Sequence, residues 1–433
     1  MRVALAGLAA CALASFALAC GGTAGSPSQP AVATPVPTPT PDPGPPNIVF
    51  ILADDMGYGD LGSFGGTKIR TPNIDRHAAE GVRFTNFYVA APVCAPSRAA
   101  IMTGRWPPRT GITWNPPEGL HPDEVTIAEA LHPAGYANAL VGKWHLGWPP
   151  DLPLRHGFDY FYGTATGEDE NTFYLNDQPT KDTVSPDQFA KRYTEEALKF
   201  ISAHKGQPFF VYIGEREPHL PSDPPSDYAG RSAAGAYGDT VEWLDTNVGD
   251  LMKGLKDMGL DQNTLVVFTS DNGPPVGSGF TSPFHGGKGS CEEGGIHMPA
   301  IMRWPARIRP GRVVAELANT VDLFPTLVSL ARTTLPARHY DGVDLSRLVT
   351  GEVERIGGKG TDGGRELVFW QQYGRVGALR SGRYKYLRPG LWNTDPTLFD
   401  LEADPGELTN LVPTRPDLAK QLEQRLQEIL AGG

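Results

Sequence analysis

The sequence has 433 residues, of which 40% are hydrophobic, and a formal net charge of −11 at pH 7. This length allows one large α/β domain with a smaller part, or two ordinary domains. The composition is that of a soluble globular protein and excludes a chain that is mainly disordered or embedded in a membrane. The acidic charge excludes a general nucleic-acid-binding surface, so an anionic substrate would need a local cluster of cations.

The first twenty residues have the pattern of an export signal. Arg2 is followed by an apolar run that reaches Ala19 and is too short and too rich in alanine to span a membrane well. Ala17-Leu18-Ala19 has the small-x-small pattern of ordinary cleavage, and the following Cys20-Gly21-Gly22 also makes the segment resemble a bacterial lipoprotein signal. Ala17 departs from that signal, which usually has a large aliphatic residue three positions before the cysteine. We therefore expect a signal peptide over 1–20 that is cleaved at a lipidated Cys20 in a periplasmic or cell-surface lipoprotein, with free secretion as the alternative. A membrane would then be contacted only through this lipid.

Residues 21–46 consist mainly of proline, threonine, serine, alanine and glycine. No apolar periodicity survives there, which predicts an extended, disordered linker.

Apolar runs and amphipathic stretches alternate after residue 46. Asn47–Ala53 is a continuous apolar run, typical of a strand buried on both faces. The alternation predicts a doubly wound α/β sheet. Further strands are predicted at 83–89, 137–141, 209–213 and 265–270, and helices from 72 onward and at 125–132, 188–204 and 237–255.

The pattern changes near residue 365. Short strands are predicted at 375–380, 384–387 and 397–401, with a final helix over 418–430. We therefore expect a main domain over 47–364 and, over 365–433, a C-terminal subdomain made of a small antiparallel sheet and a helix.

A reactive atom is predicted at Cys94. Pro96 suits the first turn of a helix and Gly104 suits its C-terminal end, so Cys94 would lie just ahead of the helix N-terminus. The backbone N–H groups and dipole there favour an anion, and Arg98 can point to the same place. The alternative is a buried cysteine that only packs.

Polar residues follow the predicted strands, at the edge where α/β sheets bind ligands. They are Asp54, Asp55, Lys143, His145, His219, Asp271 and Asn272. Asp54, Asp55, Asp271 and Asn272 offer only oxygen ligands, which suits a hard divalent cation. The alternative is that Asp-Asp-x-Gly and Asn-Gly are turns.

Basic side chains recur in the same segments. Two lysines and an arginine around a metal would hold a tetrahedral dianion or a sulfate monoester. The alternative for each lysine is a solvated surface position. The cations are Arg98, Lys143, His145, His219 and Lys288.

These motifs resemble those of the type I sulfatase family, in the family's order from about Asn47 to Leu411. The matching segments are Asp54-Asp55-Met56-Gly57, Cys94-Ala95-Pro96-Ser97-Arg98, Gly142-Lys143-Trp144-His145, Pro218-His219, Asp271-Asn272-Gly273 and Gly286-Gly287-Lys288-Gly289. The resemblance implies an alkaline-phosphatase-like fold, with a central, mostly parallel sheet sandwiched by helices and a small C-terminal antiparallel sheet plus helix.

The resemblance also implies a mechanism. Asp54, Asp55, Asp271 and Asn272 would bind one calcium ion. Cys94 would be converted to formylglycine by a maturation enzyme, and the aldehyde hydrate would touch the metal and attack sulfur. Asp271 would remove the proton of the attacking hydroxyl, and Arg98 would stabilise the hydrate. Lys143, His219 and Lys288 would bind the sulfate, and His219 or Lys288 would protonate the leaving alcohol. His145 would remove the proton of the second hydroxyl.

The predicted function is hydrolysis of an aryl or carbohydrate sulfate ester. Two alternatives stay open: a phosphonate monoester or phosphodiester hydrolase on the same fold, and a catalytically silent, tethered binding protein. The chain has four cysteines. Export would allow a Cys94–Cys291 disulfide, but we expect none, because both residues lie in segments that look like parts of one site.

Overall fold

The structure is a computed structural model that describes residues 42–116, 118–149, 152–165, 172–181, 183–390 and 394–432. The predicted signal peptide and nearly all of the predicted linker lie outside these ranges. Residues Pro43–Gly433 form one compact unit. No helix of the described residues is long and apolar enough to cross a membrane.

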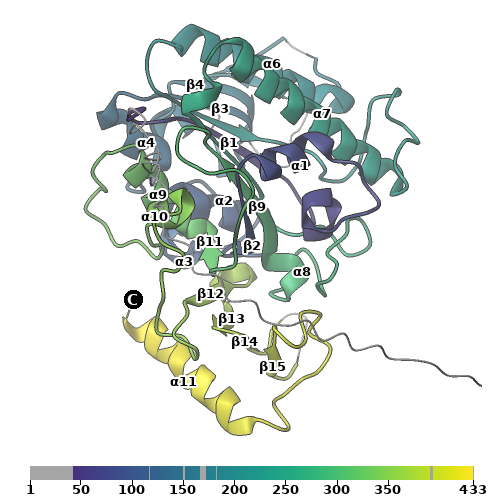
Figure 1. The fold of residues 1–433 in the computed structure, drawn as a ribbon, viewed down its shortest axis with the longest axis vertical. Coiled ribbons are helices and arrows are strands. Elements are labelled where there is room, and N and C mark those ends of the chain that lie inside the picture. The colour runs from purple at the N-terminus through teal and green to yellow at the C-terminus, as the bar shows by residue number, and fades with distance from the viewer. Residues whose placement is uncertain are drawn as a thin grey trace, which may run out of the picture. The chain divides into compact units, whose positions relative to one another are not determined.

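A large, mostly parallel sheet forms the centre of this unit (Figure 1). Among the described residues it has eleven strands in the order β10-β2-β9-β8-β1-β7-β3-β4-β5-β6, and β11 pairs with β2. β9 runs antiparallel to both of its neighbours. The strands are β1 (Asn47–Ala53), β2 (Val82–Tyr88), β3 (Ala137–Lys143), β4 (Tyr160–Thr164), β5 (Tyr174–Leu175), β6 (Gln178–Pro179), β7 (Phe209–Gly214), β8 (Thr264–Ser270), β9 (His297–Arg303), β10 (Arg312–Val314) and β11 (Ala318–Asn319).

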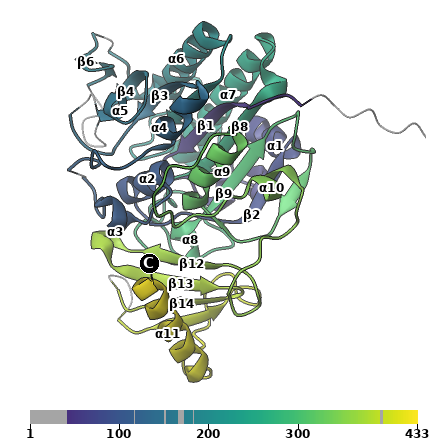
Figure 2. The same ribbon diagram turned by 90° about the vertical axis from the view of Figure 1, so that its left-hand side faces the viewer.

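Helices cover both faces of this sheet, because side chains of a strand alternate between its faces. In β1, Phe50 packs in one core with α2 and α9, whereas Ile51 packs in a second core with α1, α6 and α7 (Figure 2). The helices are α1 (Pro72–Ala79), α2 (Cys94–Thr103), α3 (Pro107–Thr110), α4 (Ile127–Leu131), α5 (Leu152–Arg155), α6 (Phe189–His204), α7 (Gly235–Asp257), α8 (Glu293–Ile296), α9 (Leu323–Leu330) and α10 (Ser346–Thr350).

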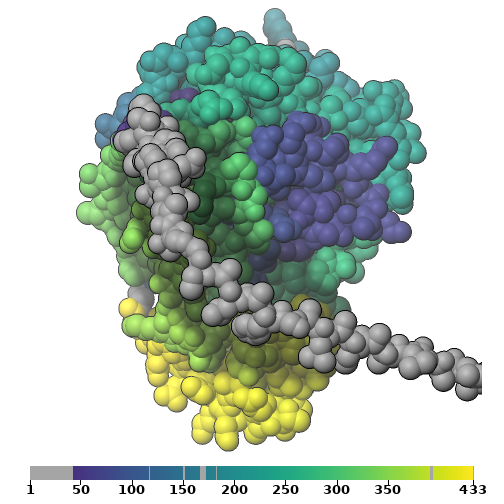
Figure 3. Space-filling model, in the orientation of Figure 1, coloured from purple at the N-terminus to yellow at the C-terminus, as the bar shows by residue number. Residues whose placement is uncertain are grey.

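The C-terminal residues form a second, antiparallel sheet. Its strands are β12 (Glu366–Trp370), β13 (Val376–Ser381), β14 (Tyr384–Leu387) and β15 (Thr397–Asp400), followed by α11 (Pro416–Gly432). One face packs on α11 through Val368 and Leu422, and the other packs on the main sheet through Phe369 and Tyr88. In the space-filling view this C-terminal region, in yellow-green to yellow, lies at one end of the molecule (Figure 3).

The predicted fold class is confirmed, with both the mostly parallel central sheet and the small antiparallel sheet. The predicted strand and helix positions agree closely with the observed ones. One local expectation was wrong: Cys94 is the first residue of α2 rather than the residue ahead of it, and Val93 is the N-cap. The sequence analysis did not predict seven of the described strands, namely β4, β5, β6, β9, β10, β11 and β12.

Candidate active site

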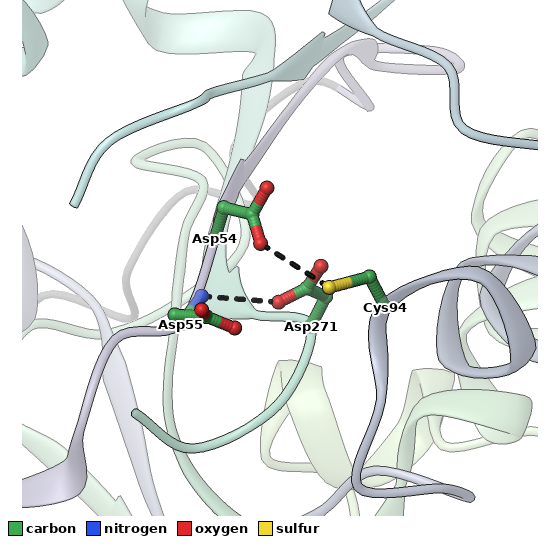
Figure 4. Close-up of side chains that lie close together, drawn as sticks. All are labelled: Asp54, Asp55, Cys94 and Asp271. Carbon is green, nitrogen blue, oxygen red and sulfur yellow. Dashed lines mark hydrogen bonds between the residues drawn. The ribbon is translucent and has the colours of Figure 1, made fainter. Parts of the chain in front are cut away.

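Two adjacent aspartates follow β1 and both face one buried cluster. Successive residues of an extended strand point to opposite sides, so Asp54 and Asp55 would diverge if the strand continued. Asp55 instead adopts a left-handed backbone conformation with φ of 63°. The Tyr237 hydroxyl donates a hydrogen bond to the Asp55 carbonyl oxygen at 3.1 Å and supports this turn. The turn lets both carboxylates join one site (Figure 4).

The register between β1 and β8 brings the next two residues of the cluster into place. The strands are parallel, with Ala53 opposite Ser270, so Asp271 emerges beside Asp54. The Asp55 backbone N–H donates to Asp271 Oδ1 at 3.2 Å, and Asn272 Nδ2 donates to Asp55 Oδ1 at 2.6 Å.

Cys94 completes the cluster from the N-terminal end of α2. Its Sγ lies 3.5 Å from Asp54 Oδ1, and the residue is only 1% exposed (Figure 4). Burial raises the pKa of the thiol well above its ordinary value, and the nearby charges of Asp54 and Asp271 raise it further. The residue is therefore a neutral thiol in this environment, not a thiolate.

Oxygen atoms suitable for a cation converge here. One ligand atom from each of Asp54, Asp55, Cys94 and Asp271 can be chosen so that all four lie within 4.8 Å of one another. Asn272 Oδ1 is buried and has no hydrogen-bond partner among the described residues. Three carboxylates and a free amide oxygen are the donor set that a hard divalent cation prefers. The residues present therefore fit such an ion.

Three cationic side chains pair with these carboxylates. Arg98 Nε lies 2.9 Å from Asp271 Oδ2, and Arg98 Nη2 lies 3.3 Å from Asp54 Oδ2. Lys143 forms an ion pair with Asp54, and Lys288 Nζ lies 2.8 Å from Asp55 Oδ2. The nearby cations hold the pKa of Asp54 well below its ordinary value despite complete burial, which acts in the opposite direction.

Two histidines lie at the same edge of the sheet. His219 Nε2 is 3.7 Å from Asp55 Oδ2, and its Nδ1 is 2.6 Å from the Leu220 carbonyl oxygen. His145 has a φ of 54° and is buried, and its Nδ1 has no hydrogen-bond partner among the described residues. Burial lowers the pKa of His145 well below its ordinary value, and Lys143 and Arg98 lower it further, so this ring is neutral.

The structure thus gathers residues from six separate segments at one edge of the sheet. Asp54, Asp55, Cys94, Arg98, Lys143, Asp271 and Lys288 are linked by the contacts above, His219 adjoins Asp55, and Asn272 bonds to Asp55. His145 is two residues beyond Lys143, and the charges of Lys143 and Arg98 lower the pKa of its ring. Cys291 lies apart from this cluster: it is a free, buried thiol in the core between the two sheets.

Sequence reasoning missed three supporting residues. Asn115 Oδ1 accepts a hydrogen bond from the Ala95 backbone N–H at 2.8 Å, next to Cys94. The Glu217 carbonyl oxygen accepts from the Asp54 backbone N–H at 3.1 Å, and Tyr237 supports Asp55. Nothing in the local sequence around Asn115 indicates this contact. The sequence pattern places Tyr237 in a predicted helix and does not indicate its contact with Asp55.

Comparison with known families agrees with this geometry. A family model described as Sulfatase matches residues 46–333, and one described as N-sulphoglucosamine sulphohydrolase, C-terminal, matches residues 288–431. The chain belongs to the sulfatase family. This sulfatase is an enzyme that hydrolyses sulfate esters, as its family and its named relatives indicate.

The sulfatase is similar to proteins from animals and bacteria. It is 37% identical to arylsulfatase A of Bos taurus, over 89% of this chain and 87% of that protein. It is 38% identical to N-acetylgalactosamine-6-sulfatase of Canis lupus familiaris, over 79% of this chain and 71% of that protein. A solved structure described under metabolism of multiple glycosaminoglycans by Bacteroides thetaiotaomicron matches with a TM-score of 0.81 and 29% identity, over 89% of this chain and 99% of that one.

Proposed function

We propose that this sulfatase is calcium-dependent and cleaves a carbohydrate or aryl sulfate monoester with a formylglycine made from Cys94. The observation that carries the proposal is the position of Cys94 Sγ, 3.5 Å from Asp54 Oδ1, in a cluster that holds both acidic oxygens and cations. A sulfate monoester needs cations for its oxygens and a nucleophile aimed at its sulfur, and both are present here.

Calcium is the cation we propose, because the donor atoms other than the residue at position 94 are all oxygens. Asp54, Asp55, Asp271 and Asn272 would hold it. When bound, such an ion supplies positive charge for a sulfate oxygen and for the hydroxyl at position 94.

The side chains around the cluster have distinct tasks in this proposal. Lys143 and Lys288, already fixed by ion pairs to Asp54 and Asp55, bind the sulfate oxygens and oppose the charge that develops as the S–O bond breaks. His219, which is partly accessible, or Lys288 protonates the oxygen of the leaving alcohol. Asp271 accepts the proton of the attacking hydroxyl, and Arg98, which is paired with Asp271, stabilises the hydrated residue at position 94.

Formylglycine explains why this chemistry needs a modified residue at position 94 rather than a plain thiol or alcohol. The hydrated aldehyde carries two hydroxyls on one carbon, so one can attack sulfur and the other can lose its proton to release sulfate. The neutral ring of His145, whose Nδ1 has no hydrogen-bond partner in the described part of the chain, is suited to accept that second proton. A serine or a thiol has no second hydroxyl.

Mass spectrometry of the peptide that contains Cys94, from protein produced together with a formylglycine-generating enzyme, tests the modification. A mass loss of about 18 Da, from CH₂–SH to CHO, is expected. Sulfate release should disappear in Cys94→Ala. An unmodified thiol in a protein that still releases sulfate would contradict the proposal.

The substrate class is proposed from the relatives. Two of them are named for aryl and N-acetylgalactosamine 6-sulfates, and the solved structure is described under glycosaminoglycan metabolism. A panel of p-nitrophenyl sulfate, sulfated disaccharides and phenyl phosphonate monoesters separates the possibilities. We expect sulfate esters to be turned over far faster than phosphonates. Faster phosphonate turnover would favour the alternative hydrolase.

We also propose export with a lipid on Cys20, on the pattern of residues 2–20. Labelling with a radioactive fatty acid, followed by detergent partitioning, should show lipid on the wild type and none on Cys20→Ala. Equal labelling of both would contradict a lipid at this residue.

A further inference from the structure

A pair of aromatic rings lies near the nucleophile and has no role in the chemistry above. Trp114 and Tyr373 stack with ring centroids 4.5 Å apart and an angle of 19° between their planes. Tyr373 is 58% exposed, so the face of its ring that does not contact Trp114 is open to solvent. An exposed, fixed aromatic surface beside a reaction centre is a common feature of ligand recognition.

The position of this aromatic pair is set by two hydrogen bonds. Asn115, the chain neighbour of Trp114, accepts from the backbone N–H of Ala95, the chain neighbour of Cys94. The Tyr373 backbone N–H donates to the Thr113 carbonyl oxygen at 2.8 Å. The aromatic pair therefore lies beside the N-terminal end of α2, where Cys94 is located.

The backbone at Tyr373 is held in an unfavourable conformation. This residue connects β12 to β13 and has φ of 62° and ψ of 27°, in the left-handed region that a bulky residue rarely adopts. Such conformations persist where the surrounding structure fixes them, and they gather at functional sites. Here the Thr113 hydrogen bond fixes the backbone and directs the ring onto Trp114.

We infer that the Trp114–Tyr373 pair binds a pyranose ring of the substrate and thereby contributes to specificity; this inference rests on the proposed sulfatase function. The anion site holds only the sulfate group, so the organic part of the ester has to extend past its mouth. A pyranose has one apolar C–H face and a rim of hydroxyl groups that need water. A single open aromatic surface can contact the apolar face of the sugar while its hydroxyl groups stay in water. A flat aryl group would bury more apolar area, and so bind more tightly, in an enclosed slot.

Steady-state kinetics with Tyr373→Ala and Tyr373→Phe tests the inference. With a sulfated disaccharide as probe, Tyr373→Ala should raise KM about three- to tenfold and change kcat by less than twofold, whereas Tyr373→Phe should retain the wild-type KM. The inhibition constant of inorganic sulfate, which occupies only the anion site, should be unchanged. Leu408→Ala, at an exposed apolar position of the C-terminal subdomain, is the matched control.

Three results would overturn the inference: an unchanged disaccharide KM in Tyr373→Ala, an equal weakening of inorganic sulfate, or a KM increase confined to p-nitrophenyl sulfate. A direct binding measurement separates this inference from the proposed function. Calorimetric titration of Cys94→Ala with the unsulfated disaccharide should show weaker binding when Tyr373→Ala is added, even if the protein proves inactive on every sulfate ester. Equal binding by both proteins would also overturn the inference.

Discussion

Arg98 Nε lies 2.9 Å from Asp271 Oδ2, and both side chains are completely buried. The same guanidinium reaches Asp54 and donates to the Lys143 carbonyl oxygen at 3.0 Å. One side chain thus joins three of the segments that build the site. Its positive charge also offsets the repulsion between two carboxylates that are excluded from water.

Replacement of Arg98 should therefore destabilise the protein as well as inactivate it. We expect Arg98→Met to abolish sulfate release and to lower the free energy of unfolding by about 3 kcal/mol, because it leaves the buried Asp271 carboxylate without its ion-pair partner. Urea denaturation at a fixed calcium concentration measures the change. Arg425→Met, which removes a partly exposed pair with Glu366, should cost under about 1 kcal/mol. Equal losses for the two variants would contradict this account.

Removal of divalent cations should weaken both activity and stability. Asp54, Asp55 and Asp271 lie close together, and the Asn272 Oδ1 atom has no hydrogen-bond partner among the residues that the structure describes. An ion bound here only in the folded state would stabilise that state. We expect EGTA to lower the Tm and the rate of sulfate release, and calcium to restore both. Asn272→Ala should require more calcium for the same Tm. A Tm that is indifferent to EGTA in the wild type would argue against a resident ion.

A buried ion-pair network attaches the small sheet to the main domain. Lys385 Nζ lies 2.7 Å from Glu293 Oε1 and 2.7 Å from Glu407 Oε1, and the lysine is fully buried. Lys385→Met should lower the free energy of unfolding by about 3 kcal/mol, since buried Glu407 loses its ion-pair partner and buried Glu293 keeps only Arg380 and His297. Lys253→Met, at an exposed pair with Asp257, should change it by under about 1 kcal/mol.

The network also adjoins the loop that carries Lys288. Glu293 begins α8 five residues later, and its backbone N–H donates to Glu407 Oε2 at 2.6 Å. We therefore expect Lys385→Met to raise KM for sulfate esters as well. The additional substitution Glu407→Gln should recover part of the stability, because it removes the buried charge that Lys385 had paired. A further loss instead would contradict the ion-pair explanation.

His77 should make the protein less stable in acid. Burial lowers its pKa to about 3, and the charge of Arg303 contributes. Below pH 6.5 the unfolded chain binds a proton that the folded protein does not, so stability falls as the pH drops from 6.5 towards 3. At pH 5 this costs about 2 kcal/mol relative to neutral pH. In His77→Gln the loss of stability between neutral pH and pH 5 should be smaller by about 2 kcal/mol. Urea denaturation at pH 5 and pH 8 measures this loss in the variant and the wild type. The same difference between variant and wild type at both pH values would contradict the assignment.

Much of the fold was predictable because its strands are continuous apolar runs. Asn47–Ala53 is buried on both faces, and β7 and β8 have the same character. β9 was missed because Pro299 interrupts it and its sequence lacks strand periodicity; its antiparallel direction comes from its neighbours β2 and β8. The local sequence of a strand does not indicate which distant strands it pairs with or in which direction.

The sequence indicated which residues belong to the candidate site, but not which contacts hold them there. Parallel strands end at one edge, so Asp54 and Asp271 could be expected near each other. The left-handed turn at Asp55 and its hydrogen bond from Tyr237 could not be expected from the sequence, because the two residues are more than 180 positions apart. The same holds for Lys385, whose partner Glu293 is 92 residues earlier.

The burial of Cys94 has a consequence for the timing of the maturation proposed above. A thiol that is 1% exposed is out of reach of another enzyme once α2 has docked, so in this proposal oxidation and folding compete for the same chain. β1 cannot pair with β8 until Thr264 has been made, about 170 residues after Cys94. At typical rates of synthesis this interval is roughly 10 to 30 s. The fraction of active molecules would then be a ratio of two rates, and it would fall in any variant that folds faster than the wild type.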